Sequence, residues 1–267
     1  MKRSSRARIG ATATVSVLSL ALITGCGGGS DGSKDSSQGS EGSNKSSSSP
    51  STAAKTLGAA ELEKLLLAKG DLEGYRTASG DDTLPGSKSE VKADKAECAP
   101  LAYAMAGLAP GDTDANASNT VTEDTAPEGA SKSPEDVSES DIANAFNVNM
   151  TFVGLSSYER DGAEKAFKAV SDGVAACSGG FGIAAQGENQ KITKVASEKA
   201  SGTGDESVAF AVDSAMDGGG TGTFHTEVVR HGSTLATYYT VNFTALTSGK
   251  AYDVPAAVID AQAAKLR

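Results

Sequence analysis

The sequence predicts an α+β domain: a twisted antiparallel sheet of about five strands, helices packed on one face of it, and one disulfide. Three observations favour this fold class. Helical periodicity marks the start of the folded part, a period of two runs through most of its second half, and a helical segment closes the chain. Helices flanking a run of strands are typical of α+β folds rather than parallel α/β folds. We therefore expect residues 56–267 to form a single domain.

Four segments are expected to be helical because their apolar residues recur every three or four positions. In the first, Leu62 and Leu66 fall on one side, and Gly70 follows as a common helix terminator. In the last, Pro255 occupies a position that the first turn of a helix favours. The expected helices span residues 57–68, 96–106, 159–176 and 254–266.

Five segments alternate apolar with polar residues, which predicts strands with one buried face. In the clearest of them, Phe224 and Val228 alternate with His225 and Glu227. The short turn His231-Gly232-Ser233 predicts a tight hairpin between the last two strands. The expected strands lie around residues 146–152, 192–195, 208–212, 223–230 and 235–243.

Residues 110–140 are nearly all small, polar or acidic, so we expect a long, mobile, acidic loop. Within it, Asp112, Asp114 and Asn116 have the spacing of calcium-loop ligands. The sixth position of that motif is Ala117, however, where a calcium loop requires glycine. We therefore favour a solvated loop and expect neither a metal nor any other cofactor.

The first 55 residues predict export followed by a flexible tether. Residues 1–8 are basic and residues 9–23 are mostly apolar or small, as in a signal peptide. The apolar run is too short for a comfortable membrane span. Residues 26–55 are rich in Gly and Ser, a composition that stays a flexible coil.

The segment Leu22-Ile23-Thr24-Gly25-Cys26 resembles the bacterial lipobox. The resemblance implies removal of residues 1–25 by cleavage between Gly25 and Cys26, and a diacylglycerol (with palmitate as an expected acyl chain) on the Cys26 thiol. We therefore expect a lipoprotein anchored to the outer face of the cell membrane, with an extracytoplasmic domain. An ordinary secretory signal with a chance cysteine is the alternative. The tether and the Ala-, Gly- and Asp-rich body are typical of actinobacterial lipoproteins.

Two further cysteines, Cys98 and Cys177, are expected to form the disulfide. The compartment outside the membrane permits disulfides, and a remaining pair in an exported domain usually forms a bridge. Each cysteine lies in or at the end of an expected helix, so the bond would join the two helices. A redox-active pair needs closely spaced cysteines, and this spacing does not provide them.

The chain is acidic, with a formal net charge of −10, and loses four basic residues with the signal peptide. Such a surface repels nucleic acid, so no nucleic-acid partner is expected. The absence of Trp and an aromatic content of 5% argue against a platform on which carbohydrate rings stack.

No catalytic constellation stands out. His225 and His231 are six residues apart, so we expect surface residues, although Glu227 on the same strand face as His225 hints at a metal site. The segment Ser156-Ser157-Tyr158 follows a strand but lacks the G-x-S-x-G turn of a hydrolase. The glycine-rich runs at 178–182 and 217–222 lack the helix N-terminus of a phosphate loop and are interpreted as turns.

One set of polar residues is a candidate binding surface on the sheet. The alternative, which we prefer, is the solvated face of a sheet that is covered on one side. The set consists of Asn147, Asn149, Thr151, Thr226, Thr240 and Asn242.

The body from Leu57 to Leu266 resembles a group of actinobacterial lipoproteins of unassigned function and, more loosely, the PknH-like extracellular sensor domain. That resemblance implies an α+β fold and a cleft for a ligand; the sensor family has two disulfides, whereas this chain offers one. The matching segments are Leu65-Leu66-Leu67 before Gly74-Tyr75, Cys98-Ala99-Pro100-Leu101, Ser156-Ser157-Tyr158, Ala175-Ala176-Cys177, Val229-Arg230-His231-Gly232, and Ala261-Gln262 with Lys265-Leu266.

Together these patterns predict a membrane-anchored ligand-binding or sensor-like module, monomeric and without catalysis. Its expected ligand is a small molecule, a lipid or an envelope protein, and the sequence identifies no ligand-binding residue. A docking module for proteins of the cell envelope and an envelope hydrolase remain the alternatives.

Overall fold

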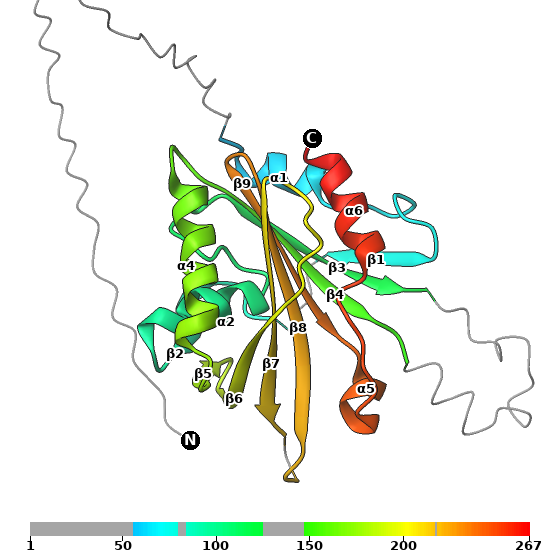
Figure 1. The fold of residues 1–267 in the computed structure, drawn as a ribbon. Helices are drawn as coiled ribbons and strands as arrows, with labels where there is room; N and C mark the ends of the chain where they lie inside the picture. The colour runs from blue at the N-terminus through cyan, green and yellow to red at the C-terminus, as the bar shows by residue number, and fades with distance from the viewer. Residues whose placement is uncertain (1–55, 80–83, 125–146, 217) are drawn as a thin grey trace, which may run out of the picture. The chain divides into compact units, whose positions relative to one another are not determined.

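The computed structural model describes residues 56–79, 84–124, 147–216 and 218–267 (Figure 1). The predicted signal peptide and tether lie outside the described residues, and so do the predicted cleavage and lipid sites at Gly25 and Cys26. The chain separates into two units, Met1–Ser49 and Pro50–Arg267, and the elements below all belong to the second.

Nine antiparallel strands of the described chain form one sheet, in the order β1-β3-β4-β9-β8-β7-β6-β5-β2 (Figure 1). The prediction of an antiparallel sheet is confirmed, whereas the prediction of about five strands is wrong. The expected hairpin is present, because His231 pairs with Thr234 across a two-residue turn. The strands are β1 (Tyr75–Ser79), β2 (Val91–Ala93), β3 (Asn116–Glu123), β4 (Met150–Ser157), β5 (Phe181–Ala185), β6 (Glu188–Glu198), β7 (Glu206–Ala215), β8 (Thr221–His231) and β9 (Thr234–Val241).

Strand β3 corrects the expectation of a continuous loop over residues 110–140. Its sequence, NASNTVTE, is polar and gives no apolar alternation, yet it pairs with β1 on one side and β4 on the other. Pairing on both sides satisfies the backbone, and Thr side chains fit a half-buried pleated surface. Residues 125–146 lie outside the described chain.

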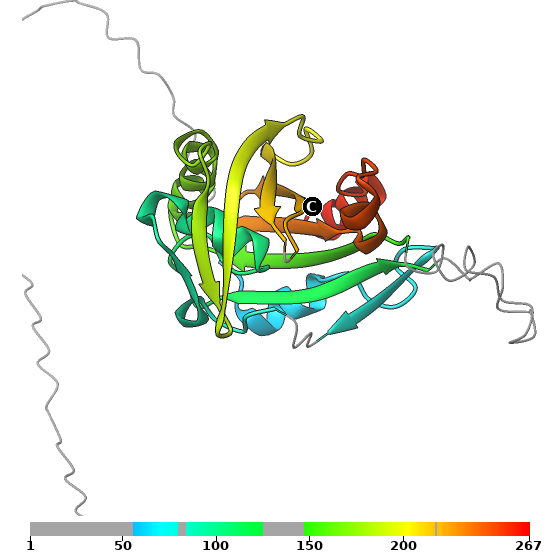
Figure 2. The same ribbon diagram turned by 90° about the horizontal axis from the view of Figure 1, so that it is seen from below.

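Helices cover both faces of the sheet, so the prediction of helices on one face is wrong. Figure 2 shows α2 and α4 gathered on one side and α6 on the other. On one face, α2 and α4 pack against Phe152, Phe210 and Val228, and on the other, α1 and α6 pack against Val153 and Tyr238. The helices are α1 (Ala59–Leu65), α2 (Ala99–Met105), α4 (Gly162–Ala176), α5 (Phe243–Ser248) and α6 (Ala256–Lys265), with two short 3-10 helices, η1 (Lys88–Glu90) and η2 (Ala96–Cys98).

Helix α2 ends directly against the sheet. A Cβ atom added at Gly154, in the middle of β4, would lie 2.3 Å from the carbonyl oxygen of Gly107, which follows α2. The close approach of these two backbones therefore requires glycine at position 154.

No helix in the described part of the chain is long and apolar enough to cross a membrane.

The predicted disulfide is confirmed: Cys98 and Cys177 are bonded, with their Cα atoms 5.9 Å apart. The bond joins the residue before α2 to the residue after α4, and both cysteines are fully buried. It therefore fixes the two helices of one face to each other.

Replacement of both cysteines by alanine should lower the free energy of unfolding by about 4 kcal/mol, because the bond closes a long loop in the unfolded chain. Urea unfolding of the protein carrying Cys26→Ser, with and without the bond, measures this difference. A loss below about 1 kcal/mol, the size of a typical single substitution, would show that α2 and α4 are held by packing alone.

Candidate functional site

A row of polar side chains crosses the α6 face of the sheet. The hydroxyls of Thr151 on β4 and Thr240 on β9 are 2.9 Å apart, and both residues are 0% exposed. Next to them, Asn242 donates a hydrogen bond of 3.0 Å to Asn149 and a longer one of 3.4 Å to Asn147. The expected solvated face is therefore wrong for its central members, which are buried and bonded to one another.

Thr226 does not belong to this row. It pairs with Phe210 and Tyr239, whose side chains lie in the core beneath α2 and α4, on the opposite face. Its hydroxyl is buried and makes no hydrogen bond within the described chain.

The segment between α5 and α6 covers part of the row. The Tyr252 hydroxyl donates to the carbonyl oxygen of Thr223 over 2.7 Å, and the Tyr252 ring meets the His225 ring edge-on at 4.5 Å. Burial raises the pKa of Tyr252 to about 12. Tyr252 therefore stays protonated, and a hydrogen-bond donor, at physiological pH.

His225 forms a pair with Glu198 across an intervening strand. Its Nδ1 lies 3.0 and 3.1 Å from the two carboxylate oxygens. Between them runs β7, where Ala209 is opposite Glu198 and Ala211 is opposite His225. These small side chains leave room for the longer ones to meet above β7. The expectation of a surface histidine is wrong, because His225 is 8% exposed.

Glu227 is buried two residues further along β8, with an exposed fraction of 4%. Its Oε1 accepts one hydrogen bond of 2.9 Å from the backbone N–H of Ser201 and another of 2.5 Å from the Ser201 hydroxyl. Burial raises the pKa of Glu227, and the two hydrogen bonds oppose that rise. Local periodicity gave no signal for this contact, since Ser201 lies in the turn between β6 and β7.

A hollow of about 580 Å³ opens beside Glu227, between the β6–β7 turn, the sheet and the start of α6. We call it the Glu227 hollow. Three carboxylates and one ammonium group line it, and the rest of its wall is largely apolar. Its lining residues are Glu198, Lys199, Ala200, Ser201, Ala209, Glu227, Asp253, Val254, Ala256 and Ile259.

His231 is not brought to the Glu227 hollow. It lies at the far end of β8, where burial lowers its pKa. Its neighbour Arg230 binds Glu206 at 2.6 Å and Asp205 at 3.2 Å, so this end of β8 is held by ion pairs.

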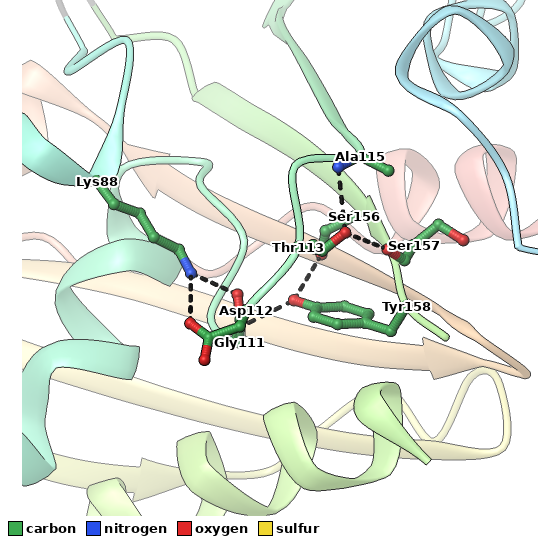
Figure 3. A network of polar contacts seen from close by, with 8 residues as sticks. All are labelled: Lys88, Gly111, Asp112, Thr113, Ala115, Ser156, Ser157 and Tyr158. Carbon is green, nitrogen blue, oxygen red and sulfur yellow. Dashed lines mark hydrogen bonds and ion pairs between the residues drawn. The ribbon is translucent and has the colours of Figure 1, made fainter. Parts of the chain in front are cut away.

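The Ser156-Ser157-Tyr158 segment anchors loops instead of forming a nucleophile site (Figure 3). The Ser156 hydroxyl donates to the Tyr158 hydroxyl, which accepts a hydrogen bond of 3.2 Å from the backbone N–H of Gly111. The Ser157 hydroxyl accepts from the backbone N–H of Leu57 at 2.9 Å. Both serine hydroxyls are thus engaged in structural hydrogen bonds: Ser157 holds Leu57 directly, and Ser156 bonds to the Tyr158 hydroxyl that holds Gly111.

Two of the residues with calcium-like spacing, Asp112 and Asp114, lie near the ammonium group of Lys88. Asp112 is fully exposed and lies 4.0 Å from Lys88, which also donates to the Gly111 carbonyl (Figure 3). Within the described residues there is no group of three or more His, Cys, Asp or Glu side chains that could hold a metal ion.

No family model matches this chain, and no curated protein matches it. Among solved structures, the extracellular domain of PknH from Mycobacterium tuberculosis is similar, at 12% sequence identity and a TM-score of 0.45. The match covers 79% of this chain and 95% of that chain.

Glu227 should make stability depend on pH. Because its pKa in the folded protein is raised, the unfolded chain loses this proton first as the pH rises above 4.5. The contribution of Glu227 to stability therefore falls as the pH rises through the raised pKa and is constant above it.

Glu227→Gln removes this dependence, so its stability relative to the wild type should increase from pH 4.5 towards neutrality. Urea unfolding at a series of pH values measures the difference, and Glu188→Gln, at an exposed position of β6, is the control. A difference that stays constant with pH would contradict the raised pKa.

Proposed function

We propose that this protein is a lipid-anchored extracytoplasmic binding module that takes a small organic cation, an aliphatic amine, in the Glu227 hollow. The observation that carries the proposal is the buried carboxylate of Glu227, whose hydrogen bonds come from a neutral residue, Ser201. A buried carboxylate without a cationic partner is costly, and a bound ammonium group supplies that partner.

The wall of the Glu227 hollow suits both the ammonium group and the hydrocarbon chain of an aliphatic amine. Glu198 and Asp253 add negative charge near Glu227, and Lys199 is the single cation in the lining. Val254 and Ile259 offer apolar surface to a hydrocarbon chain. Both hydrogen bonds from Ser201 end on Oε1, so Oε2 is the oxygen available to a ligand in the hollow.

The arrangement of the polar groups supports binding over hydrolysis. A nucleophilic serine needs a hydrogen bond to a base that is itself oriented by a third group. Here Ser201 donates to Glu227, while His225 faces Glu198, and the described hydrogen bonds do not connect the two pairs. Ser201 is therefore a positioning residue for Glu227 in this proposal.

The surface also supports a ligand hollow over an apolar docking patch. Docking surfaces expose apolar patches of several hundred Å². In the described chain, Met216 and Phe243 are the large apolar residues with exposed side chains.

Isothermal titration calorimetry of the Cys26→Ser protein at pH 7 with butylamine, putrescine and spermidine tests the proposal. We expect at least one amine to bind, and Glu227→Gln to weaken it about tenfold or more, the loss of one charge-assisted hydrogen bond. Glu188→Gln should bind as the wild type does, and sodium butyrate should not bind. Absence of amine binding, or equal binding by Glu227→Gln, would reject the cation site.

The anchor is tested separately in a bacterial host that processes lipoproteins. Wild-type protein should sediment with membranes, and Cys26→Ser should appear in the medium or the soluble fraction, because the thiol carries the lipid. Immunoblotting of the fractions measures both. Membrane retention of Cys26→Ser would contradict the lipid anchor.

A further inference from the structure

A second hollow, of about 560 Å³, lies on the same face of the sheet between the end of α1, the edge strand β1 and its neighbour β3. We call it the Asn119 hollow. It shares no lining residue with the Glu227 hollow. Its wall consists of Glu63, Leu66, Leu67, Ala68, Lys69, Thr77, Ala78, Ser79, Ser118 and Asn119.

Asn119 contributes a buried hydrogen-bond acceptor without a partner. The residue is 8% exposed, and its Oδ1 makes no hydrogen bond within the described chain. Its Nδ2 donates to the Leu67 carbonyl oxygen over 2.6 Å. Because that carbonyl can only accept, the orientation of the amide is fixed and the free atom is the oxygen.

The backbone around Leu67 is itself held in place. Gln262 of α6 is 0% exposed, accepts from the Leu67 N–H at 3.1 Å and donates to the Leu65 carbonyl at 2.8 Å. The Asn119 oxygen is therefore presented by a fixed framework, which lowers the cost of ordering the site when a ligand binds.

Hydroxyl groups accompany this acceptor. Ser79 of β1 is directly opposite Asn119, and Thr77 is directly opposite Val121. Thr77, Ser79 and Asn119 consequently share one face, with the two hydroxyl residues about 7 Å apart along the strand. At the rim, Glu63 and Lys69 are both exposed and their charges offset each other.

We propose that the Asn119 hollow is a second binding site, for a small neutral polyhydroxyl molecule that donates one hydroxyl to Asn119 Oδ1. A neutral amide oxygen accepts such a donor but does not compensate the burial of a cation, and it repels an anion. Thr77 and Ser79 both donate and accept, which suits neighbouring hydroxyls of a polyol. Recognition here depends on hydrogen bonds, and no aromatic residue lines the hollow.

The test uses ¹⁵N–¹H NMR of the full chain carrying Cys26→Ser, titrated with myo-inositol and with D-glucose. We expect the side-chain amide of Asn119 and the backbone amides of Thr77 and Ser79 to shift, while Ser201 at the Glu227 hollow stays unchanged. No shift at Asn119 up to about 50 mM of either probe, beyond the weak end of useful affinity, would overturn the proposal.

Asn119→Leu removes the acceptor and should weaken binding about tenfold or more, the loss of one hydrogen bond to a buried group. Ser171→Ala, at an exposed position of α4 on the opposite face of the sheet, is the control. The milder Ser79→Ala tests the same hollow should Asn119→Leu fail to fold, and it should weaken binding severalfold. Unchanged affinity in every folded variant of the hollow, or equal shifts with butylamine or acetate, would reject a neutral polyol site.

Discussion

The structure depends on one constraint: its central strands are buried on both faces and must be covered on both. All eight residues of β9 are buried, and β4 beside it is buried from Thr151 to Ser157. Two of their buried polar residues, Thr151 and Thr240, bond to each other through their hydroxyls. The cover on one face is α2 and α4, joined by the disulfide; on the other it is α1 and α6, brought together from the two ends of the folded chain.

The Glu227 hollow follows from how α6 meets this sheet. Val258 and Ile259 pack with Val229 and Tyr238, but the sheet continues beyond them to β7 and β6. There Ala209 and Ala211 provide little bulk, and the space above them receives the longer polar side chains of β6 and β8. A polar cluster and a cavity thus arise at the same place, because small residues on one strand make room for both.

Much of the fold could be predicted from the sequence, because β7, β8, β9 and α4 carry clear periodicity, Pro255 marks the start of α6, and the predicted export favoured a disulfide between the two cysteines. Strand β3 could not, since its mostly polar sequence shows no clear alternation. Its backbone is paired by β1 and β4, and Ala117 and Val121 pack in the cluster beneath α1. The contacts of the candidate site could not be predicted for a related reason. Alternation showed His225 and Glu227 on one face of β8 but assigned that face to solvent, whereas their partners Glu198 and Ser201 lie 27 and 26 residues away in the chain. Such contacts are set by strand order, which local pattern does not contain.

Helix α6 contacts the surroundings of both the Glu227 hollow and the Asn119 hollow. Its first turn supplies Ala256 and Ile259 to the wall of the Glu227 hollow. One turn later, Gln262 forms hydrogen bonds with the backbone of Leu65 and Leu67 beside the Asn119 hollow. A buried amide that bonds to main chain on a different element transmits displacement, because slipping would leave its polar atoms unpaired. A displacement of α6 would therefore be felt at both cavities. If a ligand in one cavity displaced α6, thermodynamic linkage would require a ligand in the other cavity to have the same effect in return.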